Sequence, residues 1–363
     1  MTSPNEPFTA LIFALALYLM HLKKINTEID MKLVNFESGG QERLGALADG
    51  KIYDLNTCYA LFLMGTTRDG VGKDDADVLT RMTEKANAEM PYRMIDFLKL
   101  GDQAMQRAEK VLHRVSKSSG EFPKNAVRKA SEVRFKAPIP RPGKILCLAG
   151  NYAEHIKEGG RAVVGKEKMA PRVFMKPSTA IMGNGDSIML PKIGNKIDWE
   201  AELAVIIGKK GKYIKPEDAY DYVAGYSIMN DVSERELIIE KDREPTEWNK
   251  FFDWLNGKWM DTFAPMGPCL VTKDEITDPH NLGIRLKVNG QIKQDSNTGN
   301  MIFSIPELIE FISRIMTLEP GDIIATGTPE GTGHAIGQFL KNGDVVEVEI
   351  DSIGMIKNPV ELE

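Results

Sequence analysis

The chain has 363 residues, which at about 100–200 residues per domain predicts two domains. Hydrophobic residues make up 42% and charged residues 27% of the chain, which excludes a disordered protein, a collagen-like fibre and a multi-span membrane protein. The formal net charge of −6 argues against a nucleic-acid-binding protein, which normally carries a basic face. Three cysteines, far apart and at no zinc-binding spacing, indicate free thiols in a reducing, cytoplasmic setting.

The first part of the chain contains an apolar stretch from Phe8 to Leu22, uncharged apart from His21. At about 15 residues it is shorter than the roughly 20 that span a bilayer. It lacks the basic start and the small-residue cleavage site of a signal peptide. We therefore expect residues 1–30 to be an apolar extension ahead of the first domain. The alternatives are a helix packed on the body or a partner, and a targeting or membrane element.

Residues 31–135 are expected to form a small α+β domain. Two strand-like runs precede Asp49-Gly50, which is a strong hairpin turn, and a third run follows it. From about residue 74 to 118, apolar residues recur at spacings of three and four, the pattern of amphipathic helices. Three prolines within residues 136–143 indicate a stiff connector, and we place the domain boundary there.

Residues 144–363 are rich in strand patterns and contain two expected helices, over 234–249 and 305–315. Ser304 is the expected N-cap of the second helix, with Glu307 as its capping-box partner. Asn289-Gly290 is expected to form a hairpin turn. The expected strands are Lys144–Leu148, Val173–Lys176, Leu203–Ile207, Val223–Met229, Ile284–Val288, Ile323–Thr326 and Val345–Ile350.

The sharpest local feature is a cluster of carboxylates. Glu200 and Glu202 are two residues apart at the start of a predicted strand, so their side chains share one face. Asp231, at the end of another apolar strand, supplies a third carboxylate. Such a cluster repels itself unless a cation neutralises it, and hard oxygen ligands suit Mg²⁺, Mn²⁺ or Ca²⁺ rather than zinc. The alternative is the solvated face of an edge strand.

Three other patterns are less specific. His155 and Glu158 are one helical turn apart, so Glu158 can orient the imidazole as a base, or the pair lies on a solvated helix. The glycine-rich loop with Gly327 and Thr328 offers hydroxyl and backbone N–H groups to an anionic oxygen, or is a tight surface turn. Lys258, in an aromatic stretch, is either a cation of the site or a solvated lysine.

Together and in this order, these signals make residues 144–363 resemble the fumarylacetoacetate hydrolase family. The motifs that carry the resemblance are NYAEH at 151–155, KPSTAI at 176–181, GNGD at 183–186, DWEAELAVIIG at 198–208, AGYSIMNDVSERE at 224–236, KWMDTFAPMGP at 258–268, VNGQIKQDSNT at 288–298 and GDIIATGTPEGTG at 321–333. The resemblance implies an α+β protein in which a mixed β-sandwich or β-roll surrounds one divalent metal. It also implies a homodimer, with the small N-terminal domain found in longer family members.

The resemblance also implies roles for individual residues. The expected site consists of the metal ligands Glu200, Glu202 and Asp231, the catalytic residues His155, Glu158 and Lys258, and the substrate-binding residues Thr328, Gly327 and Asn151. The chain departs from the family pattern at Ile238, where many members carry a polar residue, often Gln.

The function that this implies is a Mg²⁺- or Mn²⁺-dependent hydrolase of an acylpyruvate-type or diketo-acid substrate; Ca²⁺ is a further possible occupant in a crystal. His155 would activate water while the metal and Lys258 stabilise the enolate. The alternative is a lyase, decarboxylase or isomerase of a 2-oxo or sugar-derived acid, such as oxaloacetate, ureidoglycolate or a hydroxy-diene-dioate. A non-catalytic binding protein of the same fold is the third hypothesis. No nucleic-acid or membrane partner is expected.

Overall fold

The computed structural model describes residues 31–66, 76–117, 122–240, 242–244 and 246–363. The expected N-terminal extension, with its apolar stretch, lies outside the described residues. Within the described part of the chain, no helix combines the length and the apolar character needed to cross a membrane. The α-helices are α2 (Leu55–Thr66), α3 (Ala76–Glu89), α4 (Met94–Lys99), α5 (Asp102–Ser116), α6 (Ala153–Glu158), α7 (Glu247–Asn256), α8 (Ile305–Ile315) and α9 (Gly333–Ile336).

Strands from both halves of the chain form one twelve-stranded sheet. Its strands are β1 (Lys32–Ser38), β2 (Gln41–Ala48), β3 (Lys51–Asp54), β4 (Val127–Lys129), β5 (Phe135–Lys136), β6 (Ile145–Leu148), β7 (Val173–Lys176), β8 (Ile181–Met182), β11 (Ala201–Ile207), β12 (Val223–Asn230), β14 (Ala264–Thr272) and β17 (Ile323–Ala325). Their order is β4-β3-β2-β1-β14-β12-β11-β17-β6-β7, with β5 paired to β1 and β8 paired to β14.

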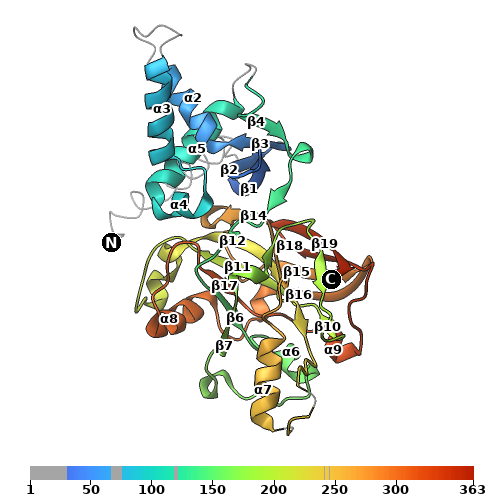
Figure 1. The fold of residues 1–363 in the computed structure, drawn as a ribbon. Coiled ribbons are helices and arrows are strands. Elements are labelled where there is room, and N and C mark those ends of the chain that lie inside the picture. Colours follow the sequence, from blue (N-terminus) through green and yellow to red (C-terminus); the bar gives the residue numbers. More distant parts are fainter. Residues whose placement is uncertain (1–30, 67–75, 118–121, 241, 245) are drawn as a thin grey trace, which may run out of the picture.

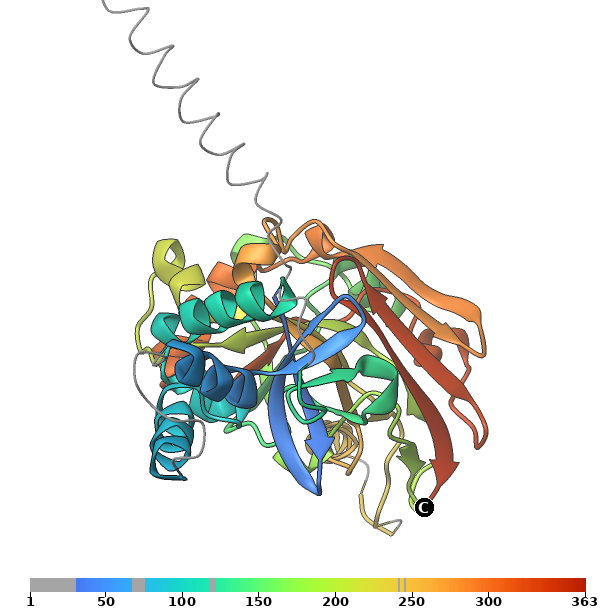
Figure 2. The same ribbon diagram turned by 90° about the horizontal axis from the view of Figure 1, so that it is seen from above.

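A second sheet of five strands lies beside the first. Its strands are β9 (Ile188–Leu190), β15 (Gly283–Val288), β16 (Gln291–Asn297), β18 (Val345–Ile350) and β19 (Gly354–Leu362). Their order is β16-β15-β18-β19-β9, and Figure 2 shows this sheet as a separate layer at one side of the molecule. A short pair, β10 (Ile197–Asp198) with β13 (Ser233–Glu234), completes the strand pairing of the described residues.

The apolar core lies between the two sheets. Leu203 and Val205 of β11 belong to the same buried cluster as Leu286 of β15. Ala204 and Ile206, which alternate with them along β11, belong to a second cluster on the other face. This alternation follows from the two-residue period of a strand. The fold is therefore the mixed β-sandwich that the resemblance implied, with a small α+β region before it (Figure 1).

The N-terminal region joins the large sheet through β1. Lys32 pairs with Val271 and Leu33 with Leu270, both in β14. The predicted hairpin is confirmed, since β2 and β3 pair across a turn at Asp49 and Gly50. Figure 1 shows α2 to α5 gathered with β1 to β4 at one end of the molecule. The division of the chain at residues 136–143 stays a prediction.

One of the two predicted helices is confirmed and the other is wrong. The helix over 305–315 is α8, and its capping box is present: the Ser304 backbone N–H donates to Glu307 Oε2 at 2.8 Å. The helix expected over 234–249 does not begin until α7, where the Thr246 side chain caps it. Upstream of α7 the chain is extended at Glu234, because its backbone N–H donates to the Gly257 carbonyl at 3.0 Å.

We expect residues 144–363 expressed alone to aggregate, or to unfold at a lower urea concentration than the whole chain. Removing β1 takes the backbone partners from Leu270 and Val271 of β14 and exposes the apolar cluster that Leu270 shares with the N-terminal region, and exposed apolar strand edges promote association. Size-exclusion chromatography and urea unfolding of both proteins check this. A monodisperse fragment with the unfolding midpoint of the whole chain would contradict it and would support two independent domains.

Candidate metal centre and active site

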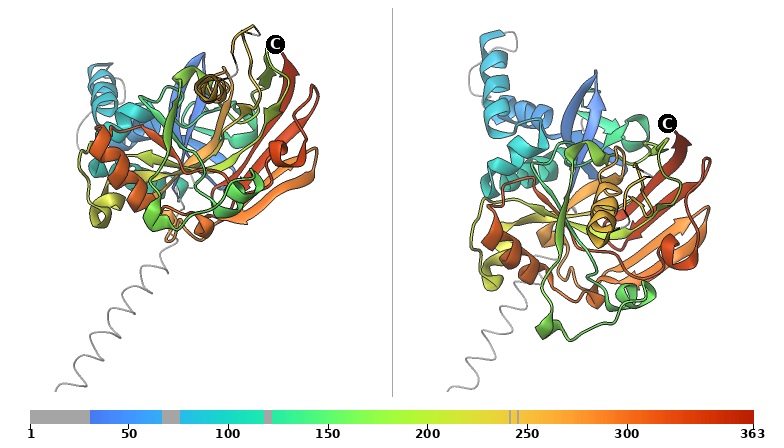
Figure 3. Two further views of the ribbon diagram at one scale, coloured as in Figure 1. Left: turned by 90° about the horizontal axis from the view of Figure 1, so that it is seen from below. Right: turned by 60° about the horizontal axis from the view of Figure 1, so that its bottom comes forward.

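The candidate site lies at one edge of the large sheet, where several strands end. Asn230 at the end of β12 pairs with Ala201 at the start of β11. Ala325 at the end of β17 pairs with Cys147 near the end of β6. The loops that leave these strands carry the predicted residues to a common place. Figure 1 labels α6 and α7 at the end of the molecule opposite the N-terminal helices, and Figure 3 views the fold from that end.

Glu200, Glu202 and Asp231 come together as a buried triad. One carboxylate oxygen of each lies within 4.8 Å of the others. The strand spacing puts Glu200 and Glu202 on one face, and the Asp231 backbone N–H donates to the Glu200 carbonyl at 2.8 Å. The interpretation as a solvated edge strand is therefore wrong, because all three side chains are inside the protein.

Two lysines pair with this triad. Lys258 Nζ lies 2.7 Å from Glu200 Oε2 and 2.7 Å from Asp231 Oδ2. Lys176 Nζ lies 2.5 Å from Asp231 Oδ1. Burial lowers the pKa of Lys258, but the charges of Asp231 and Glu200 raise it by more, so its pKa ends above the ordinary value. Lys258 is therefore a protonated cation inside the site and not a solvated surface lysine.

Arg235 links the triad to a fourth buried carboxylate. It binds Glu200, and its Nε donates to Asp198 Oδ2 at 2.7 Å. Burial raises the pKa of Glu200, but the charges of Arg235 and Lys258 lower it by more and hold it well below its ordinary range. Asp198 also accepts hydrogen bonds from the backbone N–H groups of Gly333 and His334, at 2.6 and 3.0 Å. Asp198 therefore anchors the glycine-rich loop, and His334 takes part through its backbone.

Glu202 is the carboxyl group that no basic side chain pairs with. Four buried carboxylates face three basic side chains here, and Glu202 forms no ion pair with any described residue. Its Oε2 accepts from the Gly327 backbone N–H at 2.8 Å, whereas its Oε1 has no hydrogen-bond partner in the described structure. Burial, together with the charges of Asp231 and Glu200, raises the pKa of Glu202 well above its ordinary range.

These observations fit a divalent cation. A buried carboxylate oxygen without a partner is unfavourable, and a cation bound to it removes that cost. The donor set is all oxygen, which suits Mg²⁺, Mn²⁺ or Ca²⁺. With all four carboxylates ionised, as metal binding favours, a divalent ion would turn one excess negative charge into one excess positive charge. The centre would then attract an anionic substrate.

His155 and Glu158 form the predicted pair on α6. His155 Nδ1 lies 2.8 Å from Glu158 Oε1. Glu158 also accepts from the Gly331 backbone N–H at 2.7 Å and from the Thr332 hydroxyl at 3.0 Å. Burial raises the pKa of Glu158, but these hydrogen bonds and His155 lower it overall. An ionised carboxylate only accepts, so the imidazole proton is on Nδ1 and Nε2 is free to act as a base.

The predicted substrate-binding residues hold the surrounding loops. Asn151 Nδ2 donates to the carbonyls of Phe303 and Thr326, at 3.1 and 2.8 Å. The Thr328 hydroxyl accepts from Gln294 Nε2 at 2.9 Å. In this arrangement both amide protons of Asn151 are bonded to backbone, so it connects the loop before α6 to the loop after β17. The substrate-binding role of these residues stays a prediction.

Three residues of the site were not among the predicted ones: Lys176, Arg235 and Gln294. Lys176 ends a strand that is otherwise apolar, and a lone cation in such a strand is a signal of a buried ion pair. Arg235 stands four residues after Asp231 in a run of charged residues, so the sequence does not distinguish it from an ordinary solvated arginine. Gln294 is fully buried, and its side chain accepts from the Ala201 backbone N–H at 2.9 Å. No pattern in the sequence indicates that contact.

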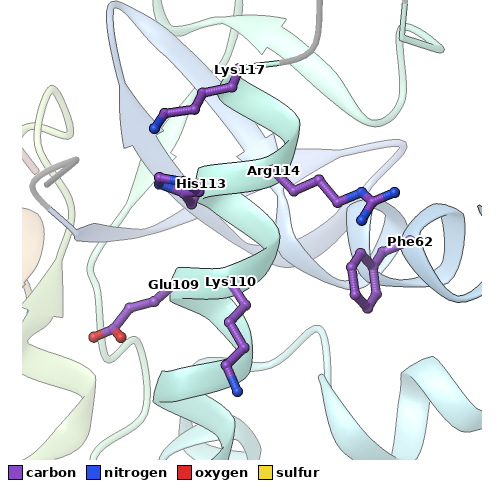
Figure 4. A pocket seen from close by; sticks show the side chains of 6 residues that line it. All are labelled: Phe62, Glu109, Lys110, His113, Arg114 and Lys117. Carbon is purple, nitrogen blue, oxygen red and sulfur yellow. The ribbon is translucent and has the colours of Figure 1, made fainter. Parts of the chain in front are cut away.

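A wide hollow on the N-terminal region lies apart from these carboxylates. Its lining comes from α2 and α5 and consists of Phe62, Glu109, Lys110, His113, Arg114 and Lys117 (Figure 4). The guanidinium of Arg114 lies over the Phe62 ring, 5.4 Å from its centroid. None of the triad or the His155 pair lines this hollow, so it is no part of the candidate site.

The chain is similar to proteins of known activity. The model of the fumarylacetoacetate (FAA) hydrolase C-terminal family matches residues 144–361. An oxaloacetate tautomerase of Xenopus laevis, named as mitochondrial, is 45% identical over 273 residues, which cover 75% of this chain and 79% of the relative. A human oxaloacetate tautomerase, also named as mitochondrial, is 42% identical over 75% of this chain and 80% of its own length.

Solved structures agree with this match. A maleylpyruvate hydrolase from Sphingobium sp. SYK-6, in complex with manganese(II) and pyruvate, is 27% identical with a TM-score of 0.64, covering 92% of this chain and 99% of that chain. A 2-hydroxyhepta-2,4-diene-1,7-dioate isomerase from Mycobacterium marinum is 26% identical with a TM-score of 0.62 and the same coverage.

We expect Mg²⁺ or Mn²⁺ to raise the unfolding temperature of EDTA-treated protein. An ion that binds only the native state stabilises it by about 2.7 kcal/mol at 100 times its Kd. Glu202→Gln should abolish most of this shift, because an amide cannot ionise to supply the carboxylate ligand that now lacks a partner. Glu132→Gln, at an exposed carboxylate, is the control. Thermal unfolding with and without ion measures the effect, and an undiminished shift in Glu202→Gln would contradict the assignment.

Glu158 should make stability depend on pH in a defined direction. Its folded pKa is below its unfolded value, so its contribution is present above the ordinary carboxyl pKa of about 4.3 and is lost as the pH falls through the folded value. We expect the difference in unfolding free energy between wild type and Glu158→Gln to shrink as the pH falls below about 4.3. Urea unfolding of both proteins at several pH values between about 3 and 7, a range that spans the titration of carboxyl groups, measures this difference. Glu154→Gln, an exposed carboxylate on the same helix, should show no such change.

Proposed function

Because this chain belongs to the fumarylacetoacetate hydrolase family, we propose that it is a divalent-metal-dependent tautomerase. It interconverts the enol and keto forms of oxaloacetate or of a closely related 2-oxo dicarboxylic acid. Relatives at 45% and 42% identity are oxaloacetate tautomerases, which supports the isomerase alternative over the hydrolase that the sequence patterns indicated first. The observation that carries the proposal is a base of fixed tautomer, His155, in one site with a carboxylate triad and buried cations.

The two tautomers differ in the position of one proton. In the keto-to-enol direction a base removes a proton from C3, the C–H electron pair forms the C2–C3 double bond, and the C2 oxygen becomes an enolate that takes up a proton. His155 is the base, because Glu158 holds the proton on Nδ1 and leaves the lone pair on Nε2. In the reverse direction the imidazolium returns its proton to C3.

The enolate is anionic, and the site is arranged to favour it. A divalent metal held by Glu200, Glu202 and Asp231 would polarise the substrate oxygens as a Lewis acid. Lys258 adds a buried positive charge that is already in place before the reaction, and preorganised charge of this kind is usually the largest catalytic effect. Lys258 is held between two of the carboxylates, so it does not have to reorganise as the enolate forms.

A second candidate is the hydrolysis of a C–C bond in an acylpyruvate. A structural neighbour at 27% identity is a maleylpyruvate hydrolase, and the same residues can serve both reactions. His155 would then take a proton from water instead of from the substrate, and the water would attack the distal carbonyl. The bond would break to release the same kind of enolate.

Mg²⁺ and Mn²⁺ are the proposed metals, and the manganese in the maleylpyruvate hydrolase complex supports a divalent ion of this class. A homodimer stays a prediction. Cytoplasmic placement also stays a prediction, since the two tautomerase relatives carry the word mitochondrial in their names.

Ketonisation of enol-oxaloacetate, followed by the loss of enol absorbance, tests the proposal. We expect the protein to accelerate it, EDTA to abolish the acceleration and Mg²⁺ or Mn²⁺ to restore it. His155→Ala should lower the rate by about 10²–10⁴, the usual contribution of a general base. Glu154→Gln, at an exposed neighbour in α6, should leave the rate unchanged.

Pyruvate release from acetylpyruvate is measured on the same protein preparation. Metal-dependent pyruvate release without any acceleration of ketonisation would overturn the tautomerase and establish the second candidate. Activity of either kind that survives both chelation and Glu200→Ala would overturn the metal-dependent mechanism altogether.

A further inference from the structure

Few buried polar side-chain atoms of the described residues lack a hydrogen-bond partner. In the part of the chain that the structure describes there are four on side chains: Arg128 Nε, Tyr152 Oη, Glu202 Oε1 and Asp322 Oδ1. Glu202 is a member of the triad, and Tyr152 lies three residues before His155 in the segment that carries the base. Two of the four therefore belong to the candidate site or its immediate support. Such groups are disfavoured unless something binds them, so each calls for an explanation.

Tyr152 is held firmly by its backbone. It is the N-cap residue of α6, with an extended backbone, and it pairs with Met301 in an isolated bridge. Its neighbour Asn151 is bonded to the backbone of two other loops. The side chain is 1% exposed, yet it belongs to neither of the apolar cores formed by the described residues. Its position is thus fixed, and packing in a core does not account for it.

Two acidic side chains, Glu202 and Glu330, act electrostatically on the buried hydroxyl. Burial and the nearby charges of Glu202 and Glu330 raise the pKa of Tyr152 well above its ordinary value. The hydroxyl is therefore protonated at neutral pH and is a donor that lacks an acceptor.

We propose that the Tyr152 hydroxyl is a substrate-binding group, which donates a hydrogen bond to a carboxylate or enolate oxygen of the bound 2-oxo acid. The identity of the substrate rests on the proposed function, but the hydrogen bond requires only an anionic oxygen in this site. The hydroxyl would stabilise the enolate more than the neutral ketone, since hydrogen bonds to charged acceptors are the stronger ones. Its partner in the substrate also explains why no protein acceptor is present among the described residues.

Tyr152→Phe removes the hydroxyl alone and tests the inference. Oxalate, whose adjacent oxyanions resemble the enolate of a 2-oxo acid, is the probe, titrated by calorimetry into Mn²⁺-loaded protein. We expect oxalate to bind at least tenfold more weakly to Tyr152→Phe, with Mn²⁺ affinity unchanged. The unfolding free energy of the ligand-free protein should be unchanged or higher, because an unpaired buried hydroxyl is replaced by an apolar edge.

Tyr59→Phe is the matched control. Its hydroxyl is bonded to Glu89 in the N-terminal region, so its loss should lower stability and leave oxalate affinity unchanged. Equal oxalate affinity in wild type and Tyr152→Phe would overturn the inference. Lower stability of Tyr152→Phe with unchanged oxalate affinity would also overturn it and assign a structural role. Tyr152-dependent oxalate binding by a protein that does not accelerate ketonisation would overturn the proposed function and leave this inference standing.

Discussion

Four carboxylates buried together at one sheet edge are the constraint on which the rest of the site depends. Such groups stay ionised inside a protein only if cations match them. The chain supplies three basic side chains from three separate segments: Lys176 from β7, Arg235 from the stretch after β13, and Lys258 from the stretch after α7. The fold must therefore bring all three segments to the ends of β11 and β12 where the carboxylates lie. The pairing of β13 with β10 places Arg235 beside Asp198 of β10, so the extended chain there serves this match of charges.

The same carboxylates also organise the glycine-rich loop after β17. Gly331 donates its backbone N–H to Glu158, and Gly333 donates its backbone N–H to Asp198. Side chains do not fit there: a Cβ on Gly331 would lie 2.1 Å from the Lys293 carbonyl oxygen, and φ at Gly331 is +94°. The loop is thus bound to the protein's own acidic groups. Through it, the metal centre and the His155 pair are parts of one hydrogen-bonded unit.

Local patterns predicted the features that depend on local geometry. The two-residue period of a strand suffices to place Glu200 and Glu202 on one face. The hairpins at Asp49-Gly50 and Asn289-Gly290, where β15 pairs with β16, follow from turn residues, and α8 follows from its capping residues. Lys176 and Arg235 escaped prediction because the partner of a buried cation depends on which strands pair, which no short segment encodes. The helix expected over 234–249 was wrong for the same reason. Strands β14 and β19 were not among the expected strands, and each contains proline, which normally argues against a strand.

Tautomerisation and C–C hydrolysis share an enolate, so the residues that stabilise it do not discriminate between them. Lys258 and a carboxylate-bound metal would lower both barriers, and His155 would be the base in both. The reaction depends on what reaches Nε2 of His155, a carbon-bound proton of the substrate or a water molecule. The side chains of His155 and Glu158 are 20% and 17% exposed, so water reaches the pair in this ligand-free structure. A bound substrate that fills this opening would exclude water and favour tautomerisation, whereas one that leaves room for water beside His155 would allow hydrolysis. Reaction specificity therefore depends on how the substrate fills the space beside α6, because the same metal ligands and the same base would serve both reactions.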